Sequence, residues 1–584
     1  MRITLLFILI NSLLHMTTYS QNTRFEESGG TETATYSEII NFYKSVAAGH
    51  EQASLINAGM SDAGKPIHVL VLNNSEIEDL NDVSAFNKPV VFINNGIHPG
   101  EPCGIDASML YVKNLLASED AKLVLNDVVI CIIPVYNIGG CLNRNSTTRA
   151  NQIGPMEYGF RGNAKHLDLN RDFIKCDSKN AKTFSQIFSA INPHIFIDTH
   201  TTNGADYQST MTLISTQKDK LHPLLASHLT SKLEPYLYES MNGTQHKMCP
   251  YVNHGGKGPK NGITGFLDIA RYSSGYTALF NTIGFITEAH MLKPYADRVL
   301  STYQFIELIT LYAQNNAQEL VKLKQQANEE TKTQTDFALQ WELNKDENQE
   351  IAFDGYEKDI AISNITGDEV TVYNKEKPYT ENISFYNNYH ITKTVKRPYA
   401  YVIPSAWTNV IERLKLNNVA IQVIKEDLEI DLPVNYLHHY ETLDWPFEGH
   451  YLHHSTSITP KNMNVKLYAG DYLIICNQIQ NKYILQTLEP EGPDSFFNWN
   501  FFDSILMQKE YFSDYLFDAT AEKILSENAE LKAELEALKQ NDQNFADNAG
   551  AQLDFIYKRS EHYEKNHLLY PVIRLEKEVE ELKF

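Results

Sequence analysis

The sequence predicts an α/β fold, in which a mostly parallel or mixed sheet has helices on both faces, followed by a β-rich α+β accessory domain. Short apolar runs at 89–93, 128–136, 195–197 and 283–286 alternate with segments whose apolar residues recur at helical spacing. Continuous apolar runs are typical of strands buried on both faces, as in parallel sheets covered by helices. Beyond residue 335 the strand-like runs are separated by Gly- and Asn-bearing turns, which predicts the accessory domain.

Residues 1–20 are typical of a secretory signal. Arg2 supplies the positive charge, and the apolar stretch 3–14 is too short to span a bilayer comfortably. Thr18 and Ser20 are the small residues of a cleavage site that would leave Gln21 as the mature start. A buried N-terminal helix is the alternative, but no capping or amphipathic pattern supports it. We expect export to the periplasm or the exterior, with no membrane insertion after the signal is removed.

The remaining chain divides into four predicted parts. They are a mobile arm at 21–34, the main α/β domain at 35–330, the β-rich accessory domain at 336–515, and a helical segment at 516–584 that packs on the body. The arm is polar and contains glycines. A capping box formed by Thr35 and Glu38 begins the first helix of the main domain. One long helix over 296–334 is expected to end that domain in a polar linker.

Three local features of the accessory domain also carry predictions. Residues 472–476 and 483–488 resemble the strands of a hairpin. The aromatic cluster at 496–502 is expected to form a core or an interdomain seam, with a sugar- or peptide-binding face as the alternative. The histidines of segment 450–454 are expected to be solvated or hydrogen-bonded, with a second metal site as the alternative.

The formal net charge is −23, from 50 Lys and Arg against 73 Asp and Glu. This balance argues against nucleic acid and against anionic membrane surfaces as partners. The six cysteines form no CxxC pair, so a thiolate metal site is not indicated. Cys131 and Cys476 lie in apolar runs and are expected to be buried thiols. The sequence gives no indication of oligomeric state.

His98 and Glu101 lie on a Gly- and Pro-bearing turn that follows the predicted strand at 89–93. In open α/β sheets, ligands bind at the carboxyl ends of strands. An imidazole and a carboxylate three residues apart can bind one Zn²⁺, which needs three protein ligands and an open position in a catalytic site. The alternative is a polar turn with a solvated Glu.

His200 occupies an equivalent position after the strand at 195–197 and can supply the third ligand. Asp198, two residues earlier, can orient its imidazole by accepting a hydrogen bond from the ring. A structural histidine is the alternative.

Between these motifs, Asn170 and Arg171 can clamp a carboxylate, because Arg offers a planar fork and Asn an amide donor. Arg161 and Arg149 are further cations upstream. Each Arg could instead lie on the surface, and Asp172 could neutralise Arg171 in a structural pair.

Glu288 follows the apolar run at 283–286 and can act as a general base toward a metal-activated water. The alternative is a surface charge at a strand end. The Gly- and Ser-bearing segment 271–276 can form a loop from which a Tyr reaches the substrate.

Together, HPGE at 98–101, DLNRDF at 168–173, DTHTT at 198–202 and FITEAH at 285–290 resemble the zinc metallocarboxypeptidases of the carboxypeptidase A type. The resemblance covers residues 35–325. It implies one Zn²⁺ per chain and a peptide substrate with a free C-terminal carboxylate. The residues that it implicates are the zinc ligands His98, Glu101 and His200, the general base Glu288, and the carboxylate-binding pair Asn170 and Arg171.

The resemblance also implies an upstream Arg that polarises the scissile carbonyl and a substrate-contacting Tyr on a loop. Arg161 and Arg149 both match the first role, and we expect Arg161 to be catalytic and Arg149 to bind substrate. For the second role we expect Tyr276 rather than Tyr272.

Several departures leave the zinc chemistry alone but affect substrate specificity. Residues 137–140 replace the frequent Asn-Pro-Asp-Gly of the family, Asp172 stands where Asn is usual, and His290 follows the base. Deacylases of the aspartoacylase type share the zinc triad and an Asn-Arg pair. A deacylase or amidase acting on an acylated amino acid or a cell-wall peptide is therefore the alternative function. A non-catalytic binding protein is a third hypothesis, disfavoured by the intact ligands and base.

The signal prediction has a direct test. Expression of the full chain in a secreting host should give a mature protein that begins at Gln21, as read by N-terminal sequencing. Recovery of an intact Met1 on exported protein would contradict the predicted cleavage.

Overall fold

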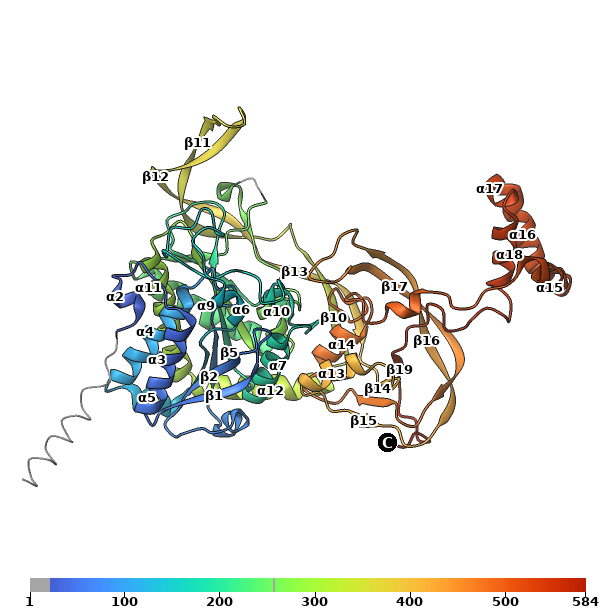
Figure 1. Cartoon of the computed structure of the whole chain (residues 1–584), viewed down its shortest axis with the longest axis horizontal. Coiled ribbons are helices and arrows are strands. Elements are labelled where there is room, and N and C mark those ends of the chain that lie inside the picture. Colours follow the sequence, from blue (N-terminus) through green and yellow to red (C-terminus); the bar gives the residue numbers. More distant parts are fainter. Residues whose placement is uncertain (1–21, 256–257) are drawn as a thin grey trace, which may run out of the picture.

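The computed structural model describes residues 22–255 and 258–584 (Figure 1). The predicted signal at residues 1–20 lies outside the described residues. Among the helices that are described, none has the length and apolarity needed to cross a bilayer.

An eight-stranded mixed sheet forms the centre of the main domain, in the order β1-β2-β4-β3-β5-β9-β6-β7. The four middle strands β4, β3, β5 and β9 are parallel. Strands β1, β2 and β6 run antiparallel to their inner neighbours, whereas β7 is parallel to β6. The strands are β1 Ala53–Met60, β2 Pro66–Leu72, β3 Val90–Asn94, β4 Val129–Ile133, β5 Ile195–Thr202, β6 Met211–Ser215, β7 Met248–Pro250 and β9 Ile283–His290.

Helices cover both faces of this sheet. Successive side chains of a strand point to opposite faces, and the apolar side chains of the central strands on both faces are buried under these helices. Phe92 and Phe196, register partners on β3 and β5, pack against Phe184 of α7. Phe285 of β9 points to the other face and contacts Phe305 of α11. The helices of this domain are α2 Arg24–Glu27, α3 Tyr36–Gly49, α4 Cys103–Ala117, α5 Ala121–Asp127, α6 Ile138–Leu142, α7 Lys179–Ile191, α8 Pro223–His228, α9 Glu234–Asn242, α10 Ser273–Ala278, α11 Tyr295–Asn315 and α12 Ala317–Thr333. The predicted α/β class is confirmed.

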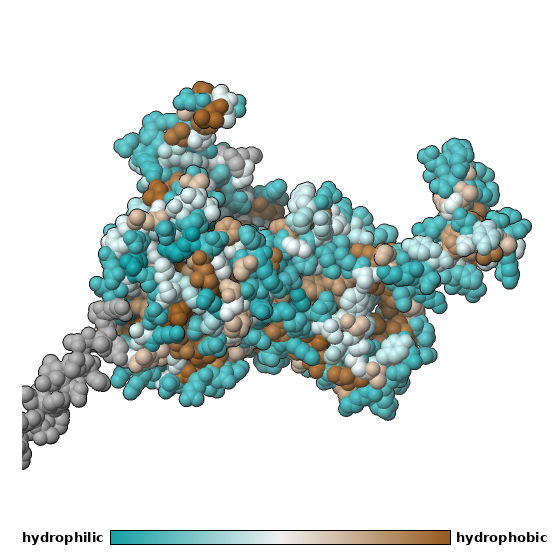
Figure 2. Space-filling model, viewed as in Figure 1, coloured by the Kyte–Doolittle hydropathy of each residue, from teal (hydrophilic) through white to brown (hydrophobic). Residues whose placement is uncertain are grey.

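Beyond α12 the chain is rich in strands, as predicted. Two ribbons are formed, one by β10 Asp336–Leu343 with β13 Tyr389–Lys396 and one by β16 Leu428–Thr442 with β17 His453–Leu467. A three-stranded sheet contains β11 Gln349–Ile362, β12 Glu369–Tyr386 and β8 Ile263–Thr264. A four-stranded sheet contains β15 Gln422–Val423, β18 Tyr472–Ile475, β14 Ala400–Ile403 and β19 Ile573–Leu575. The remaining helices are α13 Thr408–Leu416, α14 Asn481–Leu488, α15 Asp514–Glu527, α16 Ala529–Asn541, α17 Gln543–Ala546 and α18 Ala549–Tyr557. The β11–β12 hairpin projects from the body and exposes apolar side chains toward its tip (Figure 2), including Ile360, Ile362 and Ile365.

The segment expected as a mobile arm contains the short helix α2 in its described part. Thr23 and Glu26 form a capping box on α2, and Phe25 is buried against Tyr295. Phe25 and an ion pair between Glu26 and Lys113 at 2.9 Å hold this largely polar segment against the body. The capping box predicted at Thr35 and Glu38 is confirmed at the start of α3.

Two further element predictions need correction. Residues 483–488 belong to α14 instead of a hairpin, because their apolar side chains are buried on a helix beside β10 and α12. The helix expected at 296–334 is divided at Asn316 into α11 and α12.

The C-terminal segment departs in part from its prediction. Helices α15 to α18 stand away from the body (Figure 1) and pack on one another around Phe517, Leu531 and Phe555. The tail returns to the body as β19, which pairs with β14. Only this tail packs on the body as expected.

The aromatic cluster at 496–502 is buried, as expected for a core or seam, so a binding face is excluded. Trp499 is fully buried and lies beside Phe447 and His450, with the Lys175 ammonium 5.9 Å from its ring centroid. Since Lys175 belongs to the main domain, this cluster joins the two regions. The described cysteines, all six, are buried free thiols, which confirms the prediction for Cys131 and Cys476.

Truncation of Trp499 to Ala should destabilise the protein by about 3–5 kcal/mol, because it empties a large buried site. Thermal unfolding should show this as a clear fall in Tm. Trp445→Ala is the matched control, since that side chain is 63% exposed and its loss should change stability by less than about 0.5 kcal/mol. Equal changes in Tm for the two variants would contradict the conclusion that the Trp499 cluster stabilises the contact between the two regions.

Candidate active site

Three neighbouring parallel strands bring the predicted site residues together. His98 and Glu101 lie on the turn after β3, and His200 lies near the end of β5. Glu288 of β9 is the register partner of His200. The first turn of α4 packs closely against β5 at Gly104, where an added Cβ would lie only 2.0 Å from Thr199 Oγ1. Glycine at this position therefore allows α4, and the turn before it, to approach β5 and His200.

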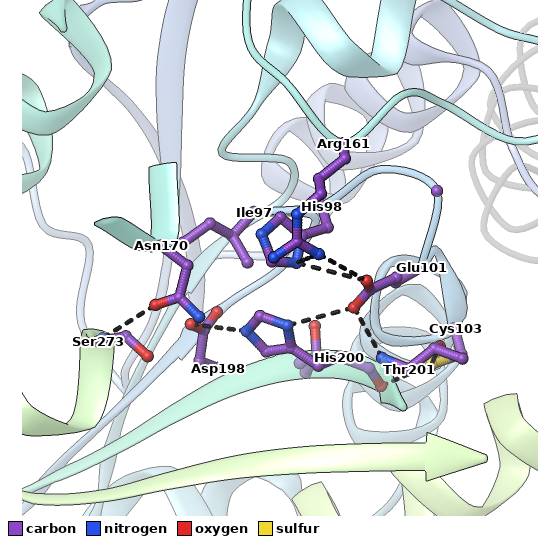
Figure 3. Close-up of polar contacts among 12 residues, drawn as sticks. Ile97, His98, Glu101, Cys103, Arg161, Asn170, Asp198, His200, Thr201 and Ser273 are labelled. Atoms are coloured by element: carbon purple, nitrogen blue, oxygen red, sulfur yellow. Dashed lines mark hydrogen bonds and ion pairs between the residues drawn. The ribbon is translucent and has the colours of Figure 1, made fainter. Parts of the chain in front are cut away.

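His98, Glu101 and His200 form a compact group that is arranged to hold a metal ion. All three are buried, and their potential ligand atoms lie within 4.8 Å of one another. Glu101 lies beside both rings, with Oε1 3.4 Å from His98 Nδ1 and Oε2 3.2 Å from His200 Nδ1 (Figure 3). Within the two described ranges, this is the only such group of His, Cys, Asp or Glu side chains.

The far nitrogen of each imidazole is held by an aspartate. His98 Nε2 lies 2.8 Å from Asp168 Oδ1, and His200 Nε2 lies 3.0 Å from Asp198 Oδ2. When the proton of each neutral ring is on Nε2, it is donated to the aspartate, and both Nδ1 lone pairs face the centre of the group, as a metal ion requires. Two imidazole nitrogens and one carboxylate with such supporting bonds fit Zn²⁺.

Charged neighbours keep the carboxylates of this group ionised. Burial alone would raise the pKa of Glu101, but the interactions with Arg149 and His98 hold it well below its usual value. Likewise, burial opposes ionisation of Asp168, but His98 and Arg161 hold its pKa well below the usual range. Ionised carboxylates are the forms that bind a metal and orient a ligand histidine.

A cavity of about 280 Å³ adjoins this group. Arg149, Arg161, Asn170, Arg171 and Glu288 all line it. The structure therefore brings these five predicted residues to the same cavity as the metal group.

Asn170 and Arg171 lie side by side on a single 3₁₀ turn. The Asn170 side chain accepts a hydrogen bond from the Ser273 amide at 3.1 Å, which leaves its own NH₂ group available as a donor. The Arg171 guanidinium lies 4.5 Å from the Tyr272 ring centroid and donates to the Asn170 carbonyl at 2.8 Å. These contacts fix the two donors beside the cavity.

Glu288 is enclosed near the metal group, and burial raises its pKa to about 7 in the metal-free protein. Glu101 raises that pKa further, whereas His200 and His98 lower it. A carboxylate whose pKa lies near neutrality is suited to accept and return a proton.

Tyr276 does not lie in the site. It is fully buried on α10, packs against Phe173 and Phe188, and donates a hydrogen bond to Asn417 Oδ1 at 2.6 Å. Its place in the core reflects the helical spacing of α10, which the sequence interpretation took for a loop. The tyrosines that line the cavity are Tyr251 and Tyr272.

Asp172 does not pair with Arg171, contrary to the alternative considered above. It accepts a hydrogen bond from buried Lys175 at 2.8 Å and from Ser178, and so stabilises the start of α7. His290 is fully buried and bonds the Ala205 carbonyl at 2.9 Å. Neither residue lines the cavity.

Asp168 is the residue that sequence reasoning missed. It stands two residues before Asn170, as Asp198 stands two residues before His200, so an acid preceding a site residue was a usable signal. Its role depends on the folding of residues 161–171 back onto the turn after β3, which spacing along the chain does not reveal.

The family model for zinc carboxypeptidases matches residues 39–409, more than half of the chain. The chain belongs to this family, and it is a metallocarboxypeptidase-type hydrolase. It is 24% identical over 497 residues to "Carboxypeptidase 2" of Trichophyton equinum, covering 80% of this chain and 84% of that protein. "Carboxypeptidase 2" of Trichophyton rubrum is 22% identical over 494 residues, with the same coverage of both chains.

Solved structures give a weaker likeness. A metallo-carboxypeptidase from Burkholderia cenocepacia aligns with a TM-score of 0.36 and 16% identity, over 48% of this chain and 70% of that chain. A metallo-carboxypeptidase from Pseudomonas aeruginosa, described in complex with (2-guanidinoethylmercapto)succinic acid, aligns with a TM-score of 0.34, 13% identity and coverage of 48% and 70%.

The ligand geometry predicts one divalent metal ion per chain. His200→Ala should abolish stoichiometric binding, because two ligands cannot hold the ion as three do. His439→Ala is a control on the exposed β16–β17 ribbon and should retain the metal. Elemental analysis of dialysed protein measures both. Stoichiometric metal in His200→Ala would contradict the assigned ligand set.

Proposed function

We propose that this protein is a zinc-dependent carboxypeptidase that removes C-terminal residues from peptides. The observation that carries the proposal is the single cavity that joins a two-histidine, one-glutamate metal group, a carboxylate with raised pKa and an Asn-Arg pair. This combination supplies a water-activating centre and a site for a free carboxylate.

Asn170 and Arg171 bind the substrate's terminal carboxylate in this proposal. An Arg fork and an amide NH₂ group form charge-assisted hydrogen bonds with COO⁻. Binding at this position places the last peptide bond of the substrate near the metal group. Specificity for the chain end therefore follows from the separation between the clamp and the ligands.

Zn²⁺, when held by His98, Glu101 and His200, supplies Lewis acidity toward a water molecule and a carbonyl oxygen. Glu288 accepts the proton of the attacking water and then donates it to the leaving amine nitrogen. Asp168 and Asp198 keep the ligand imidazoles in the tautomer that presents Nδ1.

We assign polarisation of the scissile carbonyl to Arg149. Its Nη1 lies 2.7 Å from Glu101 Oε1, closer than Arg161 Nη1, which lies 3.5 Å from the same oxygen. Arg161 donates to Asp168 Oδ2 from Nε at 3.0 Å and from Nη2 at 2.7 Å. These two hydrogen bonds to Asp168, which is not a metal ligand, give Arg161 the task of holding Asp168 ionised. This assignment exchanges the roles expected from the sequence.

Three apolar residues, Ile214, Ile286 and Phe266, line the cavity among a larger number of polar ones. The N-terminal features further support the proposal that the enzyme acts outside the cytoplasm.

Glu288→Gln should lower kcat by about 10³-fold or more, since general acid–base catalysis contributes roughly 10²–10⁴. The rate of the natural enzyme should fall as pH drops, because protonated Glu288 cannot accept a proton. Because a nearby cation favours the ionised carboxylate, the fall should lie at or below the pH set by the Glu288 pKa of about 7. Full activity of Glu288→Gln at neutral pH would contradict the assigned base.

Arg171→Ala should raise KM for peptides with a free C-terminus by about tenfold to a hundredfold, the effect of removing a charge-assisted bond of about 1.5–3 kcal/mol. C-terminally amidated peptides should be poor substrates of both proteins and show no such difference. Equal cleavage of free and amidated peptides would exclude the clamp.

The decisive experiment is hydrolysis of a mixed peptide library by the zinc-loaded mature protein, read by mass spectrometry beside a chelated control. Metal-dependent loss of single C-terminal residues is the expected result. Cleavage of N-acyl amino acids or cell-wall peptides in place of the library would favour the deacylase or amidase alternative.

A further inference from the structure

The turn at the end of the β16–β17 ribbon reaches the metal site from the accessory region. Phe447 and His450 close this turn through paired backbone hydrogen bonds of 2.7 and 3.1 Å. Between them, the Glu448 side chain extends into the main domain and accepts a hydrogen bond from the Asp168 amide at 2.7 Å. Asp168 is the residue that holds His98, so only one residue separates Glu448 from a metal ligand.

The backbone at Glu448 is unusual for its residue type. Its φ is +50°, in the left-handed region that favours glycine, and Gly449 follows at +86°. A two-residue turn with both φ values positive ordinarily has Asn-Gly or Gly-Gly. A strained non-glycine residue at the edge of an active site points to a task for its side chain.

The turn is also anchored on both sides, which gives its carboxylate a fixed position. Phe447 stacks on buried Trp499, and the Arg271 guanidinium lies 5.5 Å from the Phe447 ring. His450 Nε2 lies 2.7 Å from Asp177 Oδ2 of the main domain. Glu448 is therefore presented from a rigid seam instead of a free loop.

The contact acts on the segment that carries most of the site. Asp168 Oδ1 accepts from the Asn170 amide at 2.9 Å as well as from His98. Asn170 and Arg171 follow directly on the same 3₁₀ turn. Fixing the Asp168 amide therefore fixes the support of one metal ligand and the position of the carboxylate clamp together.

We infer that Glu448 is a positioning residue, through which the C-terminal region completes the metal site and the carboxylate clamp of the main domain. The inference rests on the proposed metal centre. It assigns the accessory region an indirect role in catalysis, through the position of Asp168, beyond adding bulk or a separate binding activity.

Glu448→Gly separates this role from a structural one, because glycine suits a left-handed turn and should fold without loss of Tm. We expect faster hydrogen exchange over residues 161–173 in the metal-free protein. We also expect about tenfold weaker zinc binding in competition with a chromophoric chelator, as for loss of a supporting partner of a ligand histidine. Glu448→Gln keeps an acceptor oxygen and should restore zinc affinity to within about threefold of the natural protein.

Asn418→Gly is the matched control. Asn418 has a φ of +56° and is exposed, so the change relieves a similar backbone conformation away from the site. It should alter neither zinc affinity nor hydrogen exchange over 161–173. Natural exchange and natural zinc affinity in a folded Glu448→Gly protein would overturn the inference. The exchange measurement reads the Glu448–Asp168 contact whatever the enzyme hydrolyses, so failure of the proposed function would be seen separately.

Discussion

The site depends on two hydrogen bonds, those from His98 Nε2 to Asp168 and from His200 Nε2 to Asp198. Each bond decides which nitrogen of a buried ring faces the metal position. Without them, an imidazole could turn over or carry its proton on the wrong atom. Asp198 is two residues from His200 on the same strand, so its bond is local. Asp168 lies 70 residues from His98 and must be delivered by tertiary structure.

That delivery explains why the main sheet and the accessory region are interlocked. The parallel strands β3, β5 and β9 place the ligands and the base at one edge. The segment 161–171 closes over them and is tied down by Arg161 from within and by Glu448 from outside. The buried Trp499 cluster holds the turn that carries Glu448. The packing around Trp499 thus also holds the turn whose Glu448 side chain supports the metal site.

Much of this could be predicted from the sequence. The ligands and the base lie at or near strand ends, and strand ends of a parallel sheet converge by rule. The Asn-Arg pair lies on a 3₁₀ turn away from any strand end and was predicted from its residue types and its motif. The capping box at Thr35 and the β-rich character of the second half were likewise local signals. Tyr276 was misassigned because helical burial and loop exposure depend on packing, which a short Gly- and Ser-bearing segment does not reveal. The burial of Phe25, the helical conformation of α14 and the separation of the C-terminal helices from the body are likewise determined by tertiary contacts that the local sequence does not show.

The atoms that bind the metal ion can be identified in one measurement. Diffraction data from zinc-loaded crystals at the zinc absorption edge would locate the ion and its ligand atoms. We predict one ion bound by Nδ1 of His98, Nδ1 of His200 and the carboxylate of Glu101, with both Nε2 atoms still bonded to Asp168 and Asp198. An ion bound through either Nε2, or ligated by Asp168 or Asp198, would contradict these ligand assignments.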